Sequence, residues 1–147
     1  MKVQENDIKC ALLVERSGEI GKLLQFEFDK KIENKYNFEC FFPSISRNSI
    51  GFVQCGFITA ALDHASSFTV AMVGHATNSS ELVTSTDMHI TFHQPVALGR
   101  SRIKIKILKL DQSKVSIQAQ VFSSNKLSAT MLHIALRLEK NSMITVY

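Results

Sequence analysis

The spacing of apolar residues in the middle of the chain predicts a long helix. Small and apolar side chains recur three or four positions apart over residues 58–68, which places them on one stripe of an α-helix. A sheet can approach such a stripe closely. A weaker helical spacing over residues 4–24, with weak points at Gly18 and Gly21, predicts one broken helix or two short ones in an N-terminal segment of residues 1–22.

Alternating apolar and polar residues predict strands on both sides of this helix. Residues 25–29 and 36–42 alternate around turn-forming residues, so we expect a hairpin that Pro43 ends. Four further runs with short connections follow the helix, at about residues 82–93, 102–107, 114–121 and 127–138. Short connections imply antiparallel neighbours. The pattern predicts an α+β fold in one domain, residues 1–147, with the helix packed against an antiparallel sheet.

Strict alternation assigns the side chains of the run at residues 82–93 to two faces. One face would hold Thr86, Met88, Ile90 and Phe92, and the other Ser85, Asp87, His89, Thr91 and His93.

Composition narrows the class of protein. A chain of 147 residues, 45% hydrophobic and 20% charged, fits one globular domain. No apolar run reaches the roughly 18 residues that a membrane-spanning helix needs, so no membrane partner is expected. Acidic residues near Met1 argue against a signal peptide, and three cysteines without a redox or metal spacing favour reduced thiols. We therefore expect a cytoplasmic protein.

The charge of the chain is modestly basic, with 17 Lys and Arg against 13 Asp and Glu. This balance suits nucleic acid, an anionic membrane or a polyanionic small molecule, and most often it reflects only a solvated surface. The main basic cluster, residues 100–114, lacks the interleaved aromatic residues on which single-stranded nucleic acid stacks. The histidines show no metal-binding spacing. Neither nucleic acid nor a metal is expected.

The segment that begins the central helix carries a family resemblance. Its residues are Asn48-Ser-Ile-Gly-Phe-Val-Gln54-Cys55-Gly56, and the helix that follows holds one carboxylate, Asp63, about two turns beyond its start. Together with the run Asp-Met-His-Ile-Thr-Phe at residues 87–92, this segment resembles the PaaI-like acyl-CoA thioesterases of the hotdog fold. The resemblance covers about residues 23–138, and it implies a long sheet curled around the central helix.

The resemblance also implies roles for individual residues. Asp63 would attack the thioester or activate the attacking water, and the sequence leaves both roles open. The N–H of Cys55 would stabilise the oxyanion, because it stands where the family has the first glycine of a Gly-Gly pair. Asn48 would hold the thioester carbonyl, and Ser85 would hydrogen-bond the water or the carboxylate. Substrate contacts are expected from Gln54, Gly56, Phe57 and Ile58.

The sequence is therefore interpreted as a thioesterase that cleaves acyl-CoA or aryl-CoA without a metal or bound cofactor. The resemblance implies a homo-oligomer, a dimer or a dimer of dimers, in which one protomer supplies Asn48, Gln54 and Cys55 and its partner supplies Asp63 and Ser85. The first alternative is an acyl-CoA-binding protein that lost the reaction through Cys55. A hotdog hydratase would need a histidine paired with an acid, and a nucleic-acid-binding role lacks a recognition helix.

Overall fold

The computed structural model describes residues 18–76 and 82–138. The expected N-terminal helical segment lies outside these residues apart from helix α2 (Gly18–Leu23). The long central helix is α3 (Cys55–Ala76), and a short 3-10 helix, η1 (Ser44–Ser46), precedes it.

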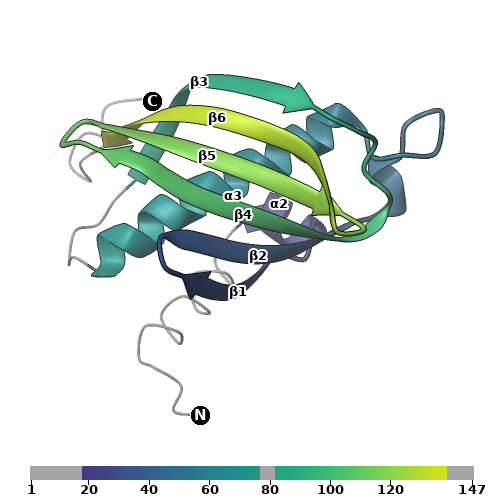
Figure 1. Cartoon of the computed structure of the whole chain (residues 1–147), viewed down its shortest axis with the longest axis horizontal. Helices are drawn as coiled ribbons and strands as arrows, with labels where there is room; N and C mark the ends of the chain where they lie inside the picture. Colours follow the sequence, from purple (N-terminus) through teal and green to yellow (C-terminus); the bar gives the residue numbers. More distant parts are fainter. Residues whose placement is uncertain (1–17, 77–81, 139–147) are drawn as a thin grey trace, which may run out of the picture.

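Six strands form one antiparallel sheet that curls around α3 (Figure 1). They are β1 (Glu27–Ile32), β2 (Lys35–Phe42), β3 (Leu82–Phe92), β4 (Gly99–Leu110), β5 (Lys114–Ser123) and β6 (Lys126–Leu138), in the spatial order β1-β2-β4-β5-β6-β3. The expected hairpin, the four later strands and the α+β hotdog architecture are confirmed. The edge strands are β1 and β3.

The core lies between α3 and the concave face of the sheet. The small-residue stripe of α3 is buried as expected, with Ala61, Leu62 and Ala65 fully covered. Ser66 and Thr69 are also buried, and each hydroxyl donates to the backbone carbonyl four residues earlier, so neither leaves an unsatisfied group in the core. The strands meet this stripe with alternating buried side chains, most regularly on β5.

One expected feature of β3 is wrong. Between Ser85 and Asp87 the register against β6 shifts by one residue, which makes Thr86 a β-bulge. Ser85 pairs with Ala135 and Met88 pairs with His133, two residues whose side chains are buried on the concave face. Ser85 therefore shares a face with Met88, whereas strict alternation separates the two. The hydroxyl of Thr86 donates to the Ile134 carbonyl, which fixes the bulge to β6.

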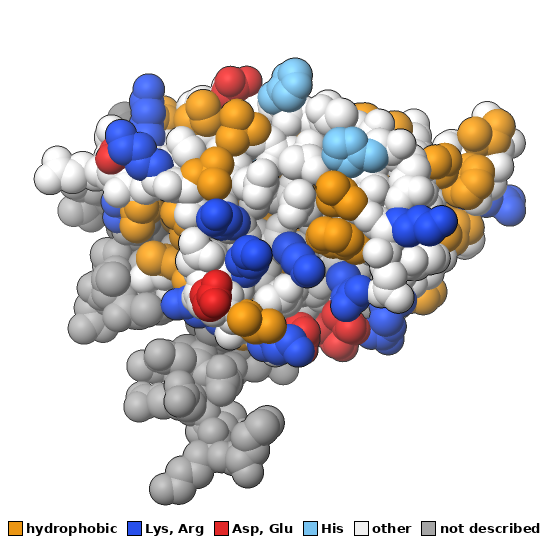
Figure 2. All heavy atoms as spheres, viewed as in Figure 1, with side chains coloured by type: hydrophobic (Ala, Val, Ile, Leu, Met, Phe, Trp, Pro, Cys, Tyr) orange, Lys and Arg blue, Asp and Glu red, His pale blue; other side chains and the backbone are white. Residues whose placement is uncertain are grey.

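The convex face of the sheet carries many of the basic residues. Figure 2 shows Lys and Arg side chains in a band across this face, over β2 and β4. Lys35 lies directly opposite Lys106, Arg100 pairs with Glu39, and Lys104 lies over the Phe122 ring at 4.7 Å. The basic residues of β4 are exposed or half-buried on this sheet face, which fits the solvated surface that the charge balance most often reflects. No helix among residues 18–76 and 82–138 is long and apolar enough to cross a membrane.

Candidate active site

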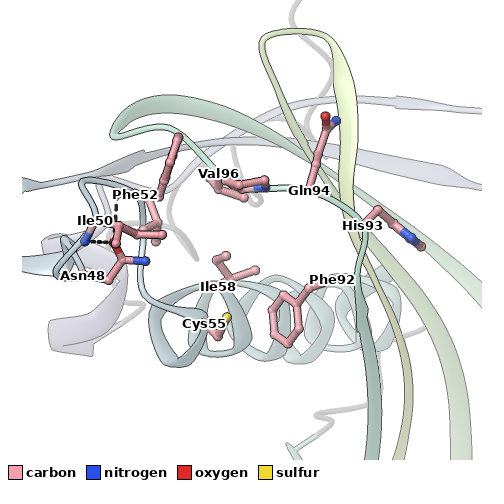
Figure 3. Close-up of a pocket in the computed structure, with 11 residues that line it drawn as sticks. Asn48, Ile50, Phe52, Cys55, Ile58, Phe92, His93, Gln94 and Val96 are labelled. Carbon is pink, nitrogen blue, oxygen red and sulfur yellow. Dashed lines mark hydrogen bonds between the residues drawn. The ribbon is translucent and has the colours of Figure 1, made fainter.

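A tight turn before α3 orients the side chain of Asn48. Its Oδ1 accepts hydrogen bonds from the backbone N–H groups of Ile50 and Phe52, at 3.1 and 3.0 Å. Gly51 closes the turn with φ +94°, a conformation that side-chain-bearing residues rarely adopt. Because its oxygen is engaged, Asn48 presents its amide nitrogen to the neighbouring pocket (Figure 3). Asn48 is thus held as a hydrogen-bond donor.

The pocket beside Asn48 is mostly apolar and lies at the N-terminus of α3. Cys55 and Ile58 of the helix line it, together with Phe92 and Val96 from β3 and the loop after it (Figure 3). Cys55 is the first residue of α3, and no residue of the described chain accepts its backbone N–H. Unpaired N–H groups at a helix start favour negative charge. The pocket therefore offers two donors, the Asn48 amide and the Cys55 N–H, beside an apolar wall.

Asp63 lies in a hydrogen-bonded cluster farther along α3. Its Oδ1 accepts a hydrogen bond of 2.8 Å from the hydroxyl of Ser85, which the bulge in β3 turns toward the helix. Ser85 Oγ lies 2.8 Å from His133 Nε2, and that nitrogen lies 3.6 Å from Asp63 Oδ1. The Asp63 side chain is 38% exposed, and no described residue contacts its Oδ2 by a hydrogen bond. One oxygen of the carboxylate is held and the other is open.

His133 is the residue of this cluster that sequence reasoning missed. Its side chain is completely buried on β6, and burial lowers its pKa while the nearby Asp63 carboxylate acts in the opposite direction. Its Nδ1 has no hydrogen-bond partner among the described residues. A partial signal was present in the sequence, because His133 alternates with Met131 and Ala135 on one of the two apolar faces of this run, and the structure buries that face.

The two groups of functional residues lie apart within one chain. Cys55 and Asp63 are eight residues apart on α3, which corresponds to about 12 Å along the helix axis. Donors that stabilise an oxyanion and a base that acts on the same carbonyl must both lie within about 3 Å of the reacting atoms. The single chain thus holds two half-sites: a donor half with Asn48 and Cys55, and a carboxylate half with Asp63, Ser85 and His133.

Of the four residues expected to contact substrate, one lines the pocket and three do not. Ile58 is buried and lines the pocket. Gln54 and Gly56 are exposed at the start of α3 and are not part of the pocket wall, and Phe57 is partly buried against the core. Gln54 contributes through its backbone, since its N–H donates to the Ser46 carbonyl and its own carbonyl accepts from Phe57.

Two other ionisable side chains, those of His64 and Cys40, lie outside the two half-sites. His64, next to Asp63 in sequence, packs against the rings of Phe26 and Phe68. Cys40 is buried in β2, where burial raises its thiol pKa to about 12, with a smaller contribution from Glu39. Across residues 18–76 and 82–138, no group of three or more His, Cys, Asp or Glu side chains is arranged to hold a metal ion.

Comparison with known proteins identifies the family. The family model described as "Thioesterase superfamily" matches residues 51–130, more than half of the chain, from the turn before α3 to β6. The chain belongs to the thioesterase superfamily. The match includes Cys55, Asp63 and Ser85 and stops short of Asn48 and His133. No curated protein matches the sequence.

Solved structures of other proteins agree with this thioesterase superfamily assignment at the level of the fold. The mouse protein thioesterase superfamily member 2 matches with a TM-score of 0.76 and 17% identity, over 91% of this chain and 98% of that chain. A phenylacetic acid degradation-related protein from Ralstonia eutropha matches with a TM-score of 0.74 and 14% identity, over 86% of this chain and 98% of that chain. A point mutant of the phenylacetic acid degradation protein PaaI from Thermus thermophilus matches with a TM-score of 0.67 and 16% identity, over 80% of this chain and 96% of that chain. The PaaI-like resemblance seen in the sequence is supported.

Proposed function

We propose that this protein hydrolyses the thioester of an acyl-CoA or aryl-CoA. The observation that carries the proposal is the state of Asp63, the single carboxylate on α3, with one oxygen held by Ser85 and the other open. Membership of the thioesterase superfamily supports thioester hydrolysis as the reaction. Coenzyme A enters as part of the substrate, and no bound cofactor takes part in the chemistry proposed below.

The reaction divides between the two half-sites. The Asn48 amide and the Cys55 N–H donate to the thioester oxygen, where negative charge develops as the nucleophile arrives. In the general-base form, Asp63 takes a proton from water, the water oxygen bonds to the carbonyl carbon, and the carbon–sulfur bond breaks. The proton then passes to the leaving thiolate. In the nucleophilic form, Asp63 itself attacks the carbonyl, and water hydrolyses the resulting anhydride.

A complete site in this proposal needs a second copy of the chain. The half-sites are about 12 Å apart along α3, too far to act on one carbonyl. The edge strand β3 has no partner on one side among the described residues, and antiparallel pairing with β3 of a second copy would bring opposite ends of the two strands together. The donor half of one protomer would then face the carboxylate half of its partner, in a dimer or a dimer of dimers.

A specific observation favours each of two alternative functions. A non-catalytic acyl-CoA-binding protein is favoured by Cys55, whose side chain lines the pocket where the family has glycine. A hotdog hydratase needs a histidine near an acid, which His133 and Asp63 supply at 3.6 Å. However, His133 is completely buried, so it cannot touch a substrate. Hydrolysis remains the proposed reaction.

A thiol-release assay tests the proposal. Purified protein is given a panel of short, medium, long and aromatic acyl-CoA esters, beside the variants Asp63→Asn and Asp29→Asn. The second variant is a matched control, because Asp29 is an exposed carboxylate on β1 far along the sheet from β3. We expect Asp63→Asn to lower turnover by about 10²-fold or more and Asp29→Asn to leave it unchanged. Equal activity in both variants would remove Asp63 from the mechanism.

A further inference from the structure

The hydrogen bonds around Ser85 have only one consistent direction. Ser85 has one hydroxyl hydrogen, and an ionised carboxylate can only accept, so this hydrogen lies on the 2.8 Å contact to Asp63 Oδ1. The 2.8 Å contact between Ser85 and His133 must then be filled by a hydrogen on Nε2. His133 Nε2 therefore carries a hydrogen, and in the neutral imidazole this leaves Nδ1 bare.

The surroundings of His133 agree with a neutral imidazole. Its cross-strand neighbours on the concave face are Met88 of β3 and Ile117 of β5, both apolar. Asp63 is the charged group that faces it from α3. The bare Nδ1 is buried and has no partner among the described residues, which costs stability, since a buried unsatisfied acceptor loses its hydration without compensation. The sequence keeps a costly histidine where the other concave-face residues of β6, such as Met131 and Ala135, are apolar.

We propose that His133 is a positioning residue for Asp63, acting through Ser85. His133 Nε2–H donates to Ser85 Oγ, and Ser85 donates to Asp63 Oδ1, so the chain of two bonds fixes the carboxylate with Oδ2 open to the substrate. This inference rests on the thioesterase function proposed above. It also assigns Ser85 its role: its hydrogen is committed to Asp63, so it orients the carboxylate and does not donate to the attacking water.

We call this chain of two hydrogen bonds, from His133 through Ser85 to Asp63, the relay. It makes Ser85 unsuited to act as a nucleophile. In a serine hydrolase triad the histidine lies between serine and aspartate and accepts the serine proton. Here the serine lies between the other two, and in the proposed arrangement the histidine nitrogen that faces it already carries a hydrogen. The order of residues along the relay therefore points to an oriented carboxylate as the reactive group.

Two substitutions of His133 separate positioning from packing. His133→Gln keeps an N–H donor near the position of Nε2, whereas His133→Leu keeps the apolar volume and removes the donor. We expect His133→Leu to lower kcat by at least tenfold and up to roughly 10²-fold, the cost of a misplaced reacting group, with KM unchanged. We expect His133→Gln to stay within about threefold of the parent, since its amide restores the donor. Thermal melts of both variants verify folding.

A double variant tests whether the three residues act as one chain. If His133 acts only through Ser85, then Ser85→Ala with His133→Leu is no slower than Ser85→Ala alone. The relay would be overturned if the fold-losses in kcat of the two single variants multiplied in the double variant. Full activity of His133→Leu would overturn it as well.

The relay can also be tested without any activity. Ring ¹⁵N NMR shifts of His133 in the unmodified protein are expected to show protonated Nε2 and bare Nδ1, and the Nε2 signal is expected to move in Ser85→Ala. An Nδ1–H tautomer would overturn the relay even in a protein that hydrolyses thioesters. The expected tautomer in a protein that hydrolyses nothing would instead leave the relay standing and end the proposed function.

Discussion

Mixing two inactive variants should restore activity if the site is shared between protomers. The variant Asn48→Ala removes a donor from one half-site, and Asp63→Asn removes the carboxylate from the other. Each homodimer then has two defective sites. A mixed dimer has one site with both defects and one site with neither, because the donor half of each chain works with the carboxylate half of its partner.

The expected recovery follows from the geometry. The separation of about 12 Å along α3 means that neither chain can complete its own site. Random exchange at equal concentrations makes half of the dimers mixed, each with one intact site of two, so the mixture should reach about a quarter of the parent activity in a symmetric dimer. Heterodimers isolated through two different tags should reach about half, by the same count.

The assay is thiol release after co-refolding, with a matched control mixture. In the control, Asp63→Asn is mixed with Ser85→Ala, two defects in the same half-site. Every mixed dimer then keeps one defect in each site, so activity should stay at the level of the single variants. Recovery in the control, or none in the test mixture, would refute the shared site and place the complete reaction within one chain.

Three further outcomes are expected. Cys55→Gly should raise kcat/KM if the thiol side chain crowds the pocket, and an unchanged value measured on the same acyl-CoA panel would show that only the backbone N–H matters. Gly51→Ala should cost roughly 1 kcal/mol of unfolding free energy in urea titrations and lower kcat, because alanine strains the positive φ that shapes the Asn48 turn; equal stability would contradict this. Burial lowers the pKa values of His64 and His133, so at acidic pH the unfolded chain binds more protons than the folded chain. The free energy of unfolding should therefore fall as pH drops below about 6.5. Urea titrations at pH 5 and 7.5 should show a smaller difference in His133→Gln than in the parent, and an equal difference would exclude His133 as a source.

The fold was predictable because its main signals are periodic. The helical stripe around Leu62 and the alternation on β5 each repeat several times, and repeated spacing specifies which face is buried. The bulge has no such signal: Ser85, Thr86 and Asp87 are all polar, so the sequence does not show which of them leaves the alternation. The bulge depends on pairing with β6, a contact between residues about 50 positions apart.

Site residues could be predicted where the sequence matches a family pattern. They could not be predicted where only tertiary packing brings a side chain to the site. Asn48 lies in the motif before α3, Asp63 follows that motif on the helix, and Ser85 lies two residues before the run at residues 87–92. The structure gives each of them a fixed geometry. His133 has no motif, and its relation to Asp63 arises only when β6 packs over α3. The separation of the two half-sites was implied by the resemblance, and the helical rise between Cys55 and Asp63 gives it a physical basis.

The bulge at Thr86 has a consequence for comparing this chain with its relatives. Because it adds one residue to β3, an ungapped alignment with a strand that lacks the bulge can match either Ser85 or Met88 to its structural equivalent, and never both. In an alignment with such a strand, a one-residue gap belongs at Thr86. Deleting that residue would force the same choice physically: the strand could turn a hydroxyl toward Asp63 or keep Met88 and Ile90 in the core. The extra residue lets one strand serve the interior and the carboxylate together.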